Sequence, residues 1–239
     1  MSLSGKRIVI LGGTSGIGLA TAQLAAREGA AVVVASSNAA RVAAALARLP
    51  EGSEGHTLDL SRESTISSFF ERLGAFDHLA FTAGEQLQLG TVASTELTLA
   101  QGFFNLRYWG AFLAAKHGAR HVRAGGSLVF TSGSASIRPQ AGWALGASIC
   151  AAMEGLTRAL ALELAPIRVN LVAPGVVKTP LWGAMPEAER AALYRDIAAH
   201  LPVGHVAEAE EIAQAYLYAM RQTYATGEVL RVDGGNALV

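Results

Sequence analysis

A glycine-rich turn near the amino end constrains this chain more than any other feature. It follows an apolar run at 7–11, opens a stretch with helical periodicity, and reads Gly12-Gly13-Thr14-Ser15-Gly16-Ile17-Gly18. In such a unit the first glycine permits the tight turn, the second lets the backbone approach a phosphate, and the third lets the helix pack against the sheet. The free N–H groups at the helix start would face a pyrophosphate. The pattern predicts a dinucleotide-binding turn, with contacts from Gly12, Thr14, Ser15, Gly16, Ile17 and Gly18.

Short β-branched runs alternate with Ala- and Leu-rich stretches of helical period along the whole chain. Most of the predicted strands are apolar nearly throughout, as in a parallel sheet covered on both faces. They lie at 7–11, 31–35, 56–59, 78–82, 127–131, 167–172 and 228–232. The predicted helices lie at 17–28, 39–49, 61–73, 95–120, 145–164 and 208–221. The sequence therefore predicts an α/β fold, a single Rossmann domain over 1–239 with a doubly wound, seven-stranded parallel sheet and helices on both faces.

Residues 180–203 do not fit this alternation and form an extra helical excursion that contains Trp182, Met185 and Tyr194. In an open α/β sheet the ligand crevice lies beyond the carboxyl ends of the strands. The excursion leaves the end of the sixth predicted strand, so we expect it to be a substrate lid. The alternative is an ordinary amphipathic pair of surface helices.

Composition excludes several classes of protein. The 19 basic and 19 acidic residues balance, and no basic stripe indicates nucleic acid or an anionic membrane surface. The apolar runs read as too short to span a bilayer, and no secretory leader is evident. The single Cys150 cannot form an internal disulfide, and no Cys/His cluster has metal spacing. We expect a cytoplasmic protein without a metal ion.

The end of the second predicted strand bears on the choice of cofactor. NAD binding usually needs a carboxylate there, whereas a 2′-phosphate favours a cation and no acid. Here the strand is followed by Ser36, Ser37 and Asn38, and Arg41 stands in the first turn of the next helix. These residues favour NADP over NAD. The alternative is that they only cap the helix, which Ser and Asn do well.

These features together resemble a short-chain dehydrogenase/reductase of the classical type. The marks of the resemblance cover almost the whole chain: Gly12-x-x-x-Gly16-Ile17-Gly18, Asp59-Leu60, Thr82-Ala83-Gly84, Asn105, Ser132, Asn170-x-x-x-Pro174-Gly175-x-x-x-Thr179 and Val232-Asp233-Gly234-Gly235. Thr82 departs mildly from the family, which commonly has Asn there.

The resemblance implies a role for each mark. Asp59 and Leu60 would contact the adenine, and Ala83 and Gly84, beside Thr82, would line the adenosine ribose. The nicotinamide carboxamide and the pyrophosphate would be held by Pro174, Gly175, Val177 and Thr179. As catalytic residues, Asn105 would kink its helix and hold a water of the proton relay, and Ser132 would bind a substrate carbonyl oxygen. Each polar residue also has a structural alternative: Asp59 as a strand-end cap, Asn105 as a buried amide and Ser132 as a turn hydroxyl.

The resemblance breaks where the family has a Tyr and, four residues later, a Lys. The positive charge of this Lys stabilises the phenolate form of the Tyr and so lowers the pKa of the Tyr from its free value of about 10 towards neutral pH. The family's Gly-Ala-Ser survives as Gly146-Ala147-Ser148, which puts Leu145 in place of Tyr and Ile149 in place of Lys. No tyrosine here has a Lys four residues downstream. Losing a general acid costs roughly 10²–10⁴ in rate. Substitutes to consider are Arg138, Gln140, Cys150, Lys178, His117, His121, His200 and His205.

The leading hypothesis is therefore an NADP-dependent oxidoreductase that acts on a carbonyl or alcohol with a non-standard proton donor. The runner-up is a catalytically silent NADP-binding sensor or partner subunit. A lyase or isomerase on the same scaffold stays open, because fold does not dictate function.

The Ala-rich predicted helices 95–120 and 145–164 carry more small apolar residues than one domain needs to bury. The family usually pairs these helices across a two-fold axis. We therefore expect a homodimer or homotetramer.

Overall fold

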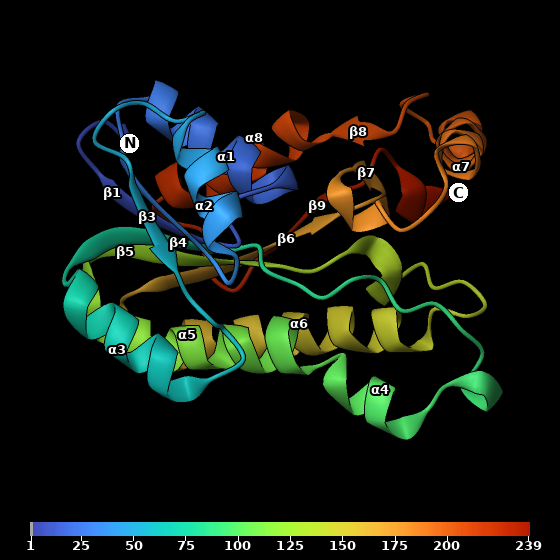
Figure 1. Cartoon of the computed structure of the whole chain (residues 1–239), viewed down its shortest axis with the longest axis horizontal. Coiled ribbons are helices and arrows are strands. Elements are labelled where there is room, and N and C mark those ends of the chain that lie inside the picture. Colours follow the sequence, from blue (N-terminus) through green and yellow to red (C-terminus); the bar gives the residue numbers. More distant parts are fainter. Residues whose placement is uncertain (1) are drawn as a thin grey trace.

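Seven strands form the central sheet of the computed structural model, which describes residues 2–239 (Figure 1). Every neighbouring pair is parallel, and the strand order is β3-β2-β1-β4-β5-β6-β9. The strands are β1 (Arg7–Leu11), β2 (Ala31–Ser36), β3 (Glu54–Thr57), β4 (Phe76–Phe81), β5 (Val122–Thr131), β6 (Arg168–Pro174) and β9 (Val229–Val232). The order reverses between β1 and β4, which is where such sheets bind ligands. The predicted doubly wound α/β fold is confirmed.

Helices cover both faces of the sheet (Figure 1). One face carries α1 (Gly16–Arg27), α2 (Ala39–Leu46) and α8 (Ala209–Arg221). The other carries α3 (Glu63–Leu73), α5 (Ala111–Gly118) and α6 (Ala144–Glu163). Alternate side chains of one strand supply both cores, since Val9 packs in the cluster with α3 and α5 while Ile8 packs in the cluster with α1 and α8. This explains why the strands read as continuous apolar runs.

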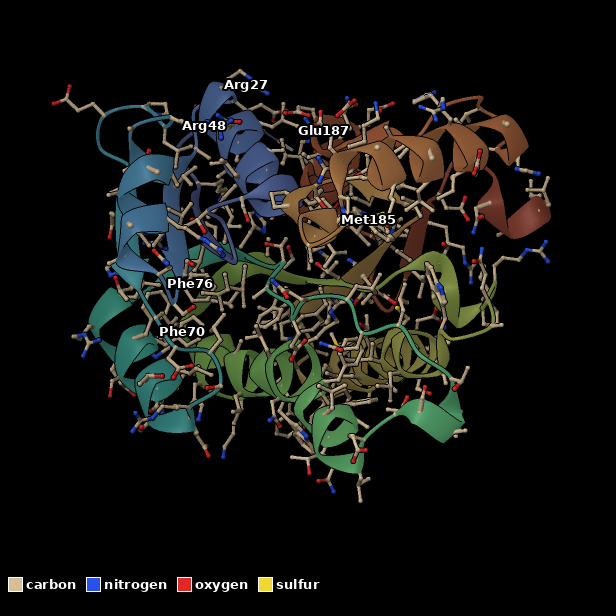
Figure 2. The ribbon with its side chains drawn as sticks, turned by 45° about the vertical axis from the view of Figure 1, so that its right-hand side comes forward. Arg27, Arg48, Phe70, Phe76, Met185 and Glu187 are labelled. Carbon is tan, nitrogen blue, oxygen red and sulfur yellow. The ribbon has the colours of Figure 1, made fainter. Side chains whose placement is uncertain are left out.

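Aromatic rings pack together in the core beside α3, whereas α7 lies outside both cores. Phe70 of α3 and Phe76 of β4 lie in one core with ring centroids 5.8 Å apart (Figure 2). Away from this pair, Met185 and Glu187 mark the start of α7 (Glu187–His200) in the same view. Helix α7 has no fully buried residue, so it contributes little to either core.

The predicted continuous helix at 95–120 is wrong. The chain instead forms the 3₁₀ turn η1 (Val92–Ser94), α4 (Leu97–Gly102), a π-helical segment η2 (Asn105–Gly110), α5 and the 3₁₀ turn η3 (Ala119–His121). Glu85 Oε1 accepts hydrogen bonds from the backbone N–H groups of Leu106 and Arg107. These two donors are thereby diverted from regular helical bonding, which is a recognised cause of a helix break.

The excursion at 180–203 is held at both ends. The 3₁₀ turn η4 (Ser134–Ser136) precedes α6. After β6 the chain forms β7 (Val177–Lys178), which pairs with β8 (Ala207–Glu208). Between these strands lie the 3₁₀ turn η5 (Pro180–Trp182) and α7, and the chain closes with the 3₁₀ turn η6 (Asn236–Leu238). The sequence did not predict this second, two-stranded sheet.

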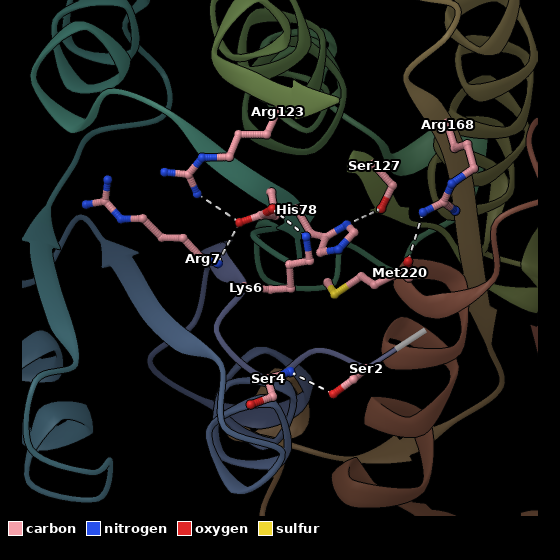
Figure 3. Close-up of polar contacts among 10 residues, drawn as sticks. Ser2, Ser4, Lys6, Arg7, His78, Arg123, Ser127, Arg168 and Met220 are labelled. Atoms are coloured by element: carbon pink, nitrogen blue, oxygen red, sulfur yellow. Dashed lines mark hydrogen bonds and ion pairs between the residues drawn. The ribbon is translucent and has the colours of Figure 1, made fainter. Parts of the chain in front are cut away.

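A polar cluster joins the strands at the edge opposite their carboxyl ends (Figure 3). Asp77 accepts hydrogen bonds from Lys6 Nζ (3.1 Å), the Arg7 backbone N–H (2.9 Å) and Arg123 Nη1 (2.9 Å). The neighbouring His78 Nδ1 lies 2.9 Å from Ser127 Oγ inside the sheet. Burial lowers the pKa of His78 to about 4, so the imidazole is neutral at pH 7.

Helix α6 bears on the expectation that the apolar runs are too short to span a bilayer. Its 20 residues, with a mean hydropathy of 1.3 over the most apolar window, are long and apolar enough to cross a bilayer. Half of that window is buried inside the protein, as in a core helix, so the composition is weak evidence for a span.

Candidate active site

A cavity of about 520 Å³ opens at the carboxyl ends of β1, β4, β5 and β6. It is lined by the glycine turn, the ends of these strands, the amino end of α6 and part of α7. The location matches the reversal of strand order, and the volume lies in the range of small-molecule sites.

The glycine turn packs closely against the end of β4. Gly12 has φ +89°, and a Cβ there would stand 2.5 Å from the Ala83 backbone nitrogen. A Cβ on Gly18 would stand 2.3 Å from the Gly12 carbonyl oxygen. Ser15, the N-cap of α1, makes no side-chain capping bond, so the first N–H groups of this helix keep their capacity to bind an anion. The cradle fits a pyrophosphate.

At the other side of the turn, the cavity is lined by Ser36, Ser37 and Arg41. Asn38 does not line it, because its Oδ1 caps α2 by accepting the Arg41 N–H at 3.0 Å. The interpretation of Asn38 as a cap is therefore the one that the geometry supports.

Asp59 and Leu60 line the same end of the cavity. Asp59 Oδ1 accepts bonds from the Ser61 hydroxyl and backbone N–H at 2.6 Å and 2.9 Å. The bond from the Ser61 hydroxyl, and after it the bond from the Ser61 N–H, lower the pKa of Asp59. The carboxylate is thus fixed in its ionised form beside the predicted adenine pocket.

The segment after β6 closes the cavity opposite the glycine turn. A Cβ on Gly16 would stand 3.2 Å from Thr179 Cβ, so the two segments nearly touch. The cavity-lining residues here include the predicted Pro174, Gly175, Val177 and Thr179.

The two predicted catalytic residues lie in different places. Ser132, at the end of β5, lines the cavity, and its Oγ donates to the Cys150 carbonyl at 3.0 Å. Asn105 is exposed and borders a separate surface hollow with Tyr108 and Trp109. The prediction that Asn105 belongs to the site is wrong, because the π-helical segment begins at this residue and turns it outward.

The face of α6 also differs from the prediction. Gly146 and Cys150 line the cavity, together with Trp143. Leu145 borders the outer hollow, and Ile149 is fully buried. The pair that faces the cavity is therefore Gly146 and Cys150, one residue later than the predicted Leu145 and Ile149. Neither pair contains a Tyr or a Lys.

Other titratable groups do not replace this pair. Burial raises the pKa of the Cys150 thiol and of the Tyr216 phenol. Tyr216 is fully buried against Thr131, with 2.5 Å between the two hydroxyl oxygens. Lys178 pairs with Glu208 at 2.6 Å and does not line the cavity, and neither do His117, His121, His200 and His205. Arg138 and Gln140 do line it.

Arg107 lines the cavity and was not predicted from the sequence. A Cβ on Gly84 would stand 2.5 Å from Arg107 Nη2 and 2.9 Å from its Nε, so the guanidinium lies against the end of β4. Within residues 2–239 this guanidinium has no ion pair or side-chain hydrogen bond. Its direction depends on the π-helical segment, and no pattern in the sequence indicates that segment.

The excursion supplies an apolar wall to the cavity. Trp182 is buried, and its Nε1 donates to the Val177 carbonyl at 3.1 Å, which fixes the ring. The remaining lining residues of the excursion are Pro180, Leu181, Leu193, Ile197 and Leu201. The arrangement favours an apolar ligand near this wall.

The sheet order, the glycine cradle and the cavity define a dinucleotide-binding Rossmann domain. The family model for an SDR-like Rossmann domain matches residues 2–239. The chain belongs to the short-chain dehydrogenase/reductase family of NAD(P)-dependent oxidoreductases, which confirms the resemblance seen in the sequence.

Three known proteins illustrate the similarity. Short-chain dehydrogenase/reductase ATR9 from Stachybotrys chlorohalonatus is 36% identical over 252 residues, covering 98% of each chain. A crystal structure of a small-chain dehydrogenase in complex with NADPH is 41% identical with a TM-score of 0.84, covering 99% of this chain and all of its own. The reductase/Diels-Alderase MalC from Malbranchea aurantiaca is 32% identical with a TM-score of 0.91, covering 99% and 98%.

Proposed function

We propose that this protein is an NADP-dependent oxidoreductase for a carbonyl or alcohol substrate, in which Arg107 compensates in part for the missing Tyr and Lys. The observation that carries the proposal is the Arg107 guanidinium, which has no ion pair within residues 2–239, in a cavity that also holds Ser132. When bound, NADPH supplies the hydride.

The proposed chemistry follows from what a guanidinium can do. It does not release a proton near neutral pH, but its N–H groups donate charge-assisted hydrogen bonds. Arg107 would stabilise the negative charge that develops on the substrate oxygen as hydride adds to carbon, and water would then protonate that oxygen. The Ser132 hydroxyl would contribute by exchanging its bond to the Cys150 carbonyl for one to the substrate oxygen. Activated or conjugated carbonyl compounds, which need no strong general acid, suit this site best.

The preference for NADP is supported by the residues at the adenosine end. Ser36, Ser37 and Arg41 line the cavity there, and β2 ends without an acidic residue. A cation and hydroxyl groups favour a 2′-phosphate. The related small-chain dehydrogenase was crystallised with NADPH, which agrees with this preference.

The residues proposed to hold the cofactor are those that were predicted from the sequence and line the cavity. They are Gly12, Thr14, Ser15, Gly16, Ile17, Gly18, Ser36, Ser37, Arg41, Asp59, Leu60, Thr82, Ala83, Gly84, Pro174, Gly175, Val177 and Thr179. We propose further that residues 180–203 act as the substrate lid, because their apolar side chains form one wall of the cavity.

The test is oxidation of NADPH with a panel of carbonyl compounds, followed by the loss of reduced-nicotinamide absorbance. Turnover that falls in Arg107→Met supports the proposal. The second candidate, a silent NADP-binding sensor or partner subunit, is favoured by the Gly and Cys that occupy the cavity face of α6. Binding of NADPH without turnover on any substrate would support that candidate instead.

We also propose a homodimer or homotetramer through 95–120 and 145–164. Large apolar side chains are exposed on these segments, including Leu97, Trp109, Phe112 and Leu162. Exposed apolar groups gathered on two helical segments are typical of an interface. Light scattering at micromolar concentration would show a mass of two or four chains, and a monomeric mass would refute this proposal.

A further inference from the structure

Glu85 follows Gly84 at the carboxyl end of β4 and lines the cavity. Strand β4 lies between β1, which leads into the glycine turn, and β5, which ends at Ser132. A dinucleotide with its pyrophosphate at the turn and its nicotinamide near Ser132 therefore crosses the end of β4. The part that lies over Glu85 would be the ribose next to the nicotinamide.

The two oxygens of the Glu85 carboxylate have different surroundings. Oε1 accepts the Leu106 N–H and, at 3.2 Å, the Arg107 N–H, so it helps to fix the segment that carries Arg107. Oε2 is buried and has no hydrogen-bond partner within the described residues 2–239. The Arg107 guanidinium, although it lines the same cavity, makes no hydrogen bond to Oε2. A buried carboxylate oxygen without a donor is unfavourable, so the site calls for a donor from a ligand.

The chemistry identifies which donor fits. A carboxylate oxygen only accepts hydrogen bonds, and the hydroxyl groups of a ribose are donors. In the family a Lys from the catalytic pair holds these hydroxyls, and here the cavity face of α6 has Gly146 and Cys150, which cannot do so. The ribose of the cofactor thus lacks its usual partner on α6, while β4 offers an unused acceptor.

We propose that Glu85 Oε2 accepts a hydrogen bond from a hydroxyl of the nicotinamide-side ribose, while Oε1 keeps the Arg107 segment in place. This rests on the proposed function, because it requires NADP(H) in the cavity. Glu85 is then a cofactor-binding and positioning residue that takes over, from another strand, the ribose contact of the missing Lys.

The test compares two ligands in the isosteric variant Glu85→Gln, which can still accept through its amide oxygen but presents an NH₂ group in place of Oε2. The probes are NADPH and 2′,5′-ADP, which lacks the nicotinamide-side ribose. Calorimetry should show NADPH binding weakened roughly 10- to 100-fold and 2′,5′-ADP binding unchanged. The matched control is Glu96→Gln, an exposed glutamate that makes no side-chain capping bond, and it should change neither affinity.

The outcomes separate this proposal from the proposed function. Unchanged NADPH affinity in Glu85→Gln, or an equal loss for both ligands, overturns the role of Glu85 alone. Failure of the wild-type protein to bind either ligand overturns both proposals. If Glu85→Gln does not fold, the wild-type protein is titrated with an NADPH analogue that lacks both hydroxyls of the nicotinamide-side ribose. Equal affinity for the analogue and NADPH would then overturn the proposal, and weaker binding of the analogue is the expected result.

Discussion

The Arg107 guanidinium lies against the backbone of Gly84, where a Cβ would stand 2.5 Å from Nη2. This contact places a positive charge in the lining of the cavity, at the end of β4. The charge comes from an interrupted helix rather than from α6, where the family carries its Lys. The proposed chemistry depends on this relationship.

The first prediction concerns that charge. Arg107→Met should lower kcat roughly 10²- to 10³-fold, because a preorganised donor to the developing oxyanion is lost. Steady-state kinetics with NADPH and the best substrate of the panel measure the effect. Arg72→Met is the control, since Arg72 is exposed on α3 and outside the cavity. Equal kcat in Arg107→Met and the wild type would contradict the role of Arg107.

The second prediction concerns the face of α6. Gly146→Tyr with Cys150→Lys should put the family's pair into the cavity and raise ketone reduction by roughly 10²-fold. A Cβ on Gly146 meets no atom within 4 Å, so a side chain there starts in open space and faces the cavity.

The matched comparison is Leu145→Tyr with Ile149→Lys. Ile149 is fully buried, so a Lys there should lower the free energy of unfolding by about 3–5 kcal/mol and restore no activity. Urea unfolding and ketone reduction measure the two pairs. A gain of activity only in the 145/149 pair would show that the cavity face is misassigned.

The third prediction concerns the cofactor. Arg41→Ala should reduce the preference for NADPH over NADH roughly five- to twentyfold, because the 2′-phosphate loses a cationic partner. Dissociation constants for both cofactors give the ratio. Arg48→Ala is the control, because Arg48 is an exposed arginine outside the cavity. A ratio that is unchanged in Arg41→Ala would leave Arg41 as ordinary surface charge.

The fourth prediction concerns pH. Burial, and next to it the charge of Arg168, lowers the pKa of His78 to about 4, whereas an unfolded His titrates near 6.5. The unfolded state therefore binds the extra proton first, and stability falls as the pH drops from about 6.5 towards 4, by about 1.4 kcal/mol per pH unit at most.

Urea unfolding at pH 7 and pH 5 tests this dependence. His78→Gln keeps a polar group near Ser127 but does not titrate, so it should lose less stability than the wild type over this interval. The same loss in both proteins would assign the acid sensitivity over this interval to groups other than His78.

The sequence predicted the features that depend on local geometry. Gly12 and Gly18 could be assigned because a Cβ at either position would collide with the neighbouring backbone, whatever the rest of the chain does. The strands could be assigned because residues such as Ile8 and Val9 face opposite cores.

The sequence could not predict which way a side chain points after a helix is interrupted. Successive residues of a helix differ by about 100° in direction, so a shift of one position turns Leu145 away and brings Gly146 to the cavity. Likewise the π-helical segment turns Asn105 outward, while Arg107 lines the cavity. Its origin lies in a contact with Glu85, twenty-one residues away from Leu106, which no local pattern indicates.

The central claim is that the cavity binds NADP(H) although the family's Tyr and Lys are absent. The direct measurement is calorimetric titration of the wild-type protein with NADPH and, separately, with NADH. We predict saturable binding of one NADPH per chain and weaker binding of NADH. Absence of binding heat with both cofactors at several temperatures would contradict the claim.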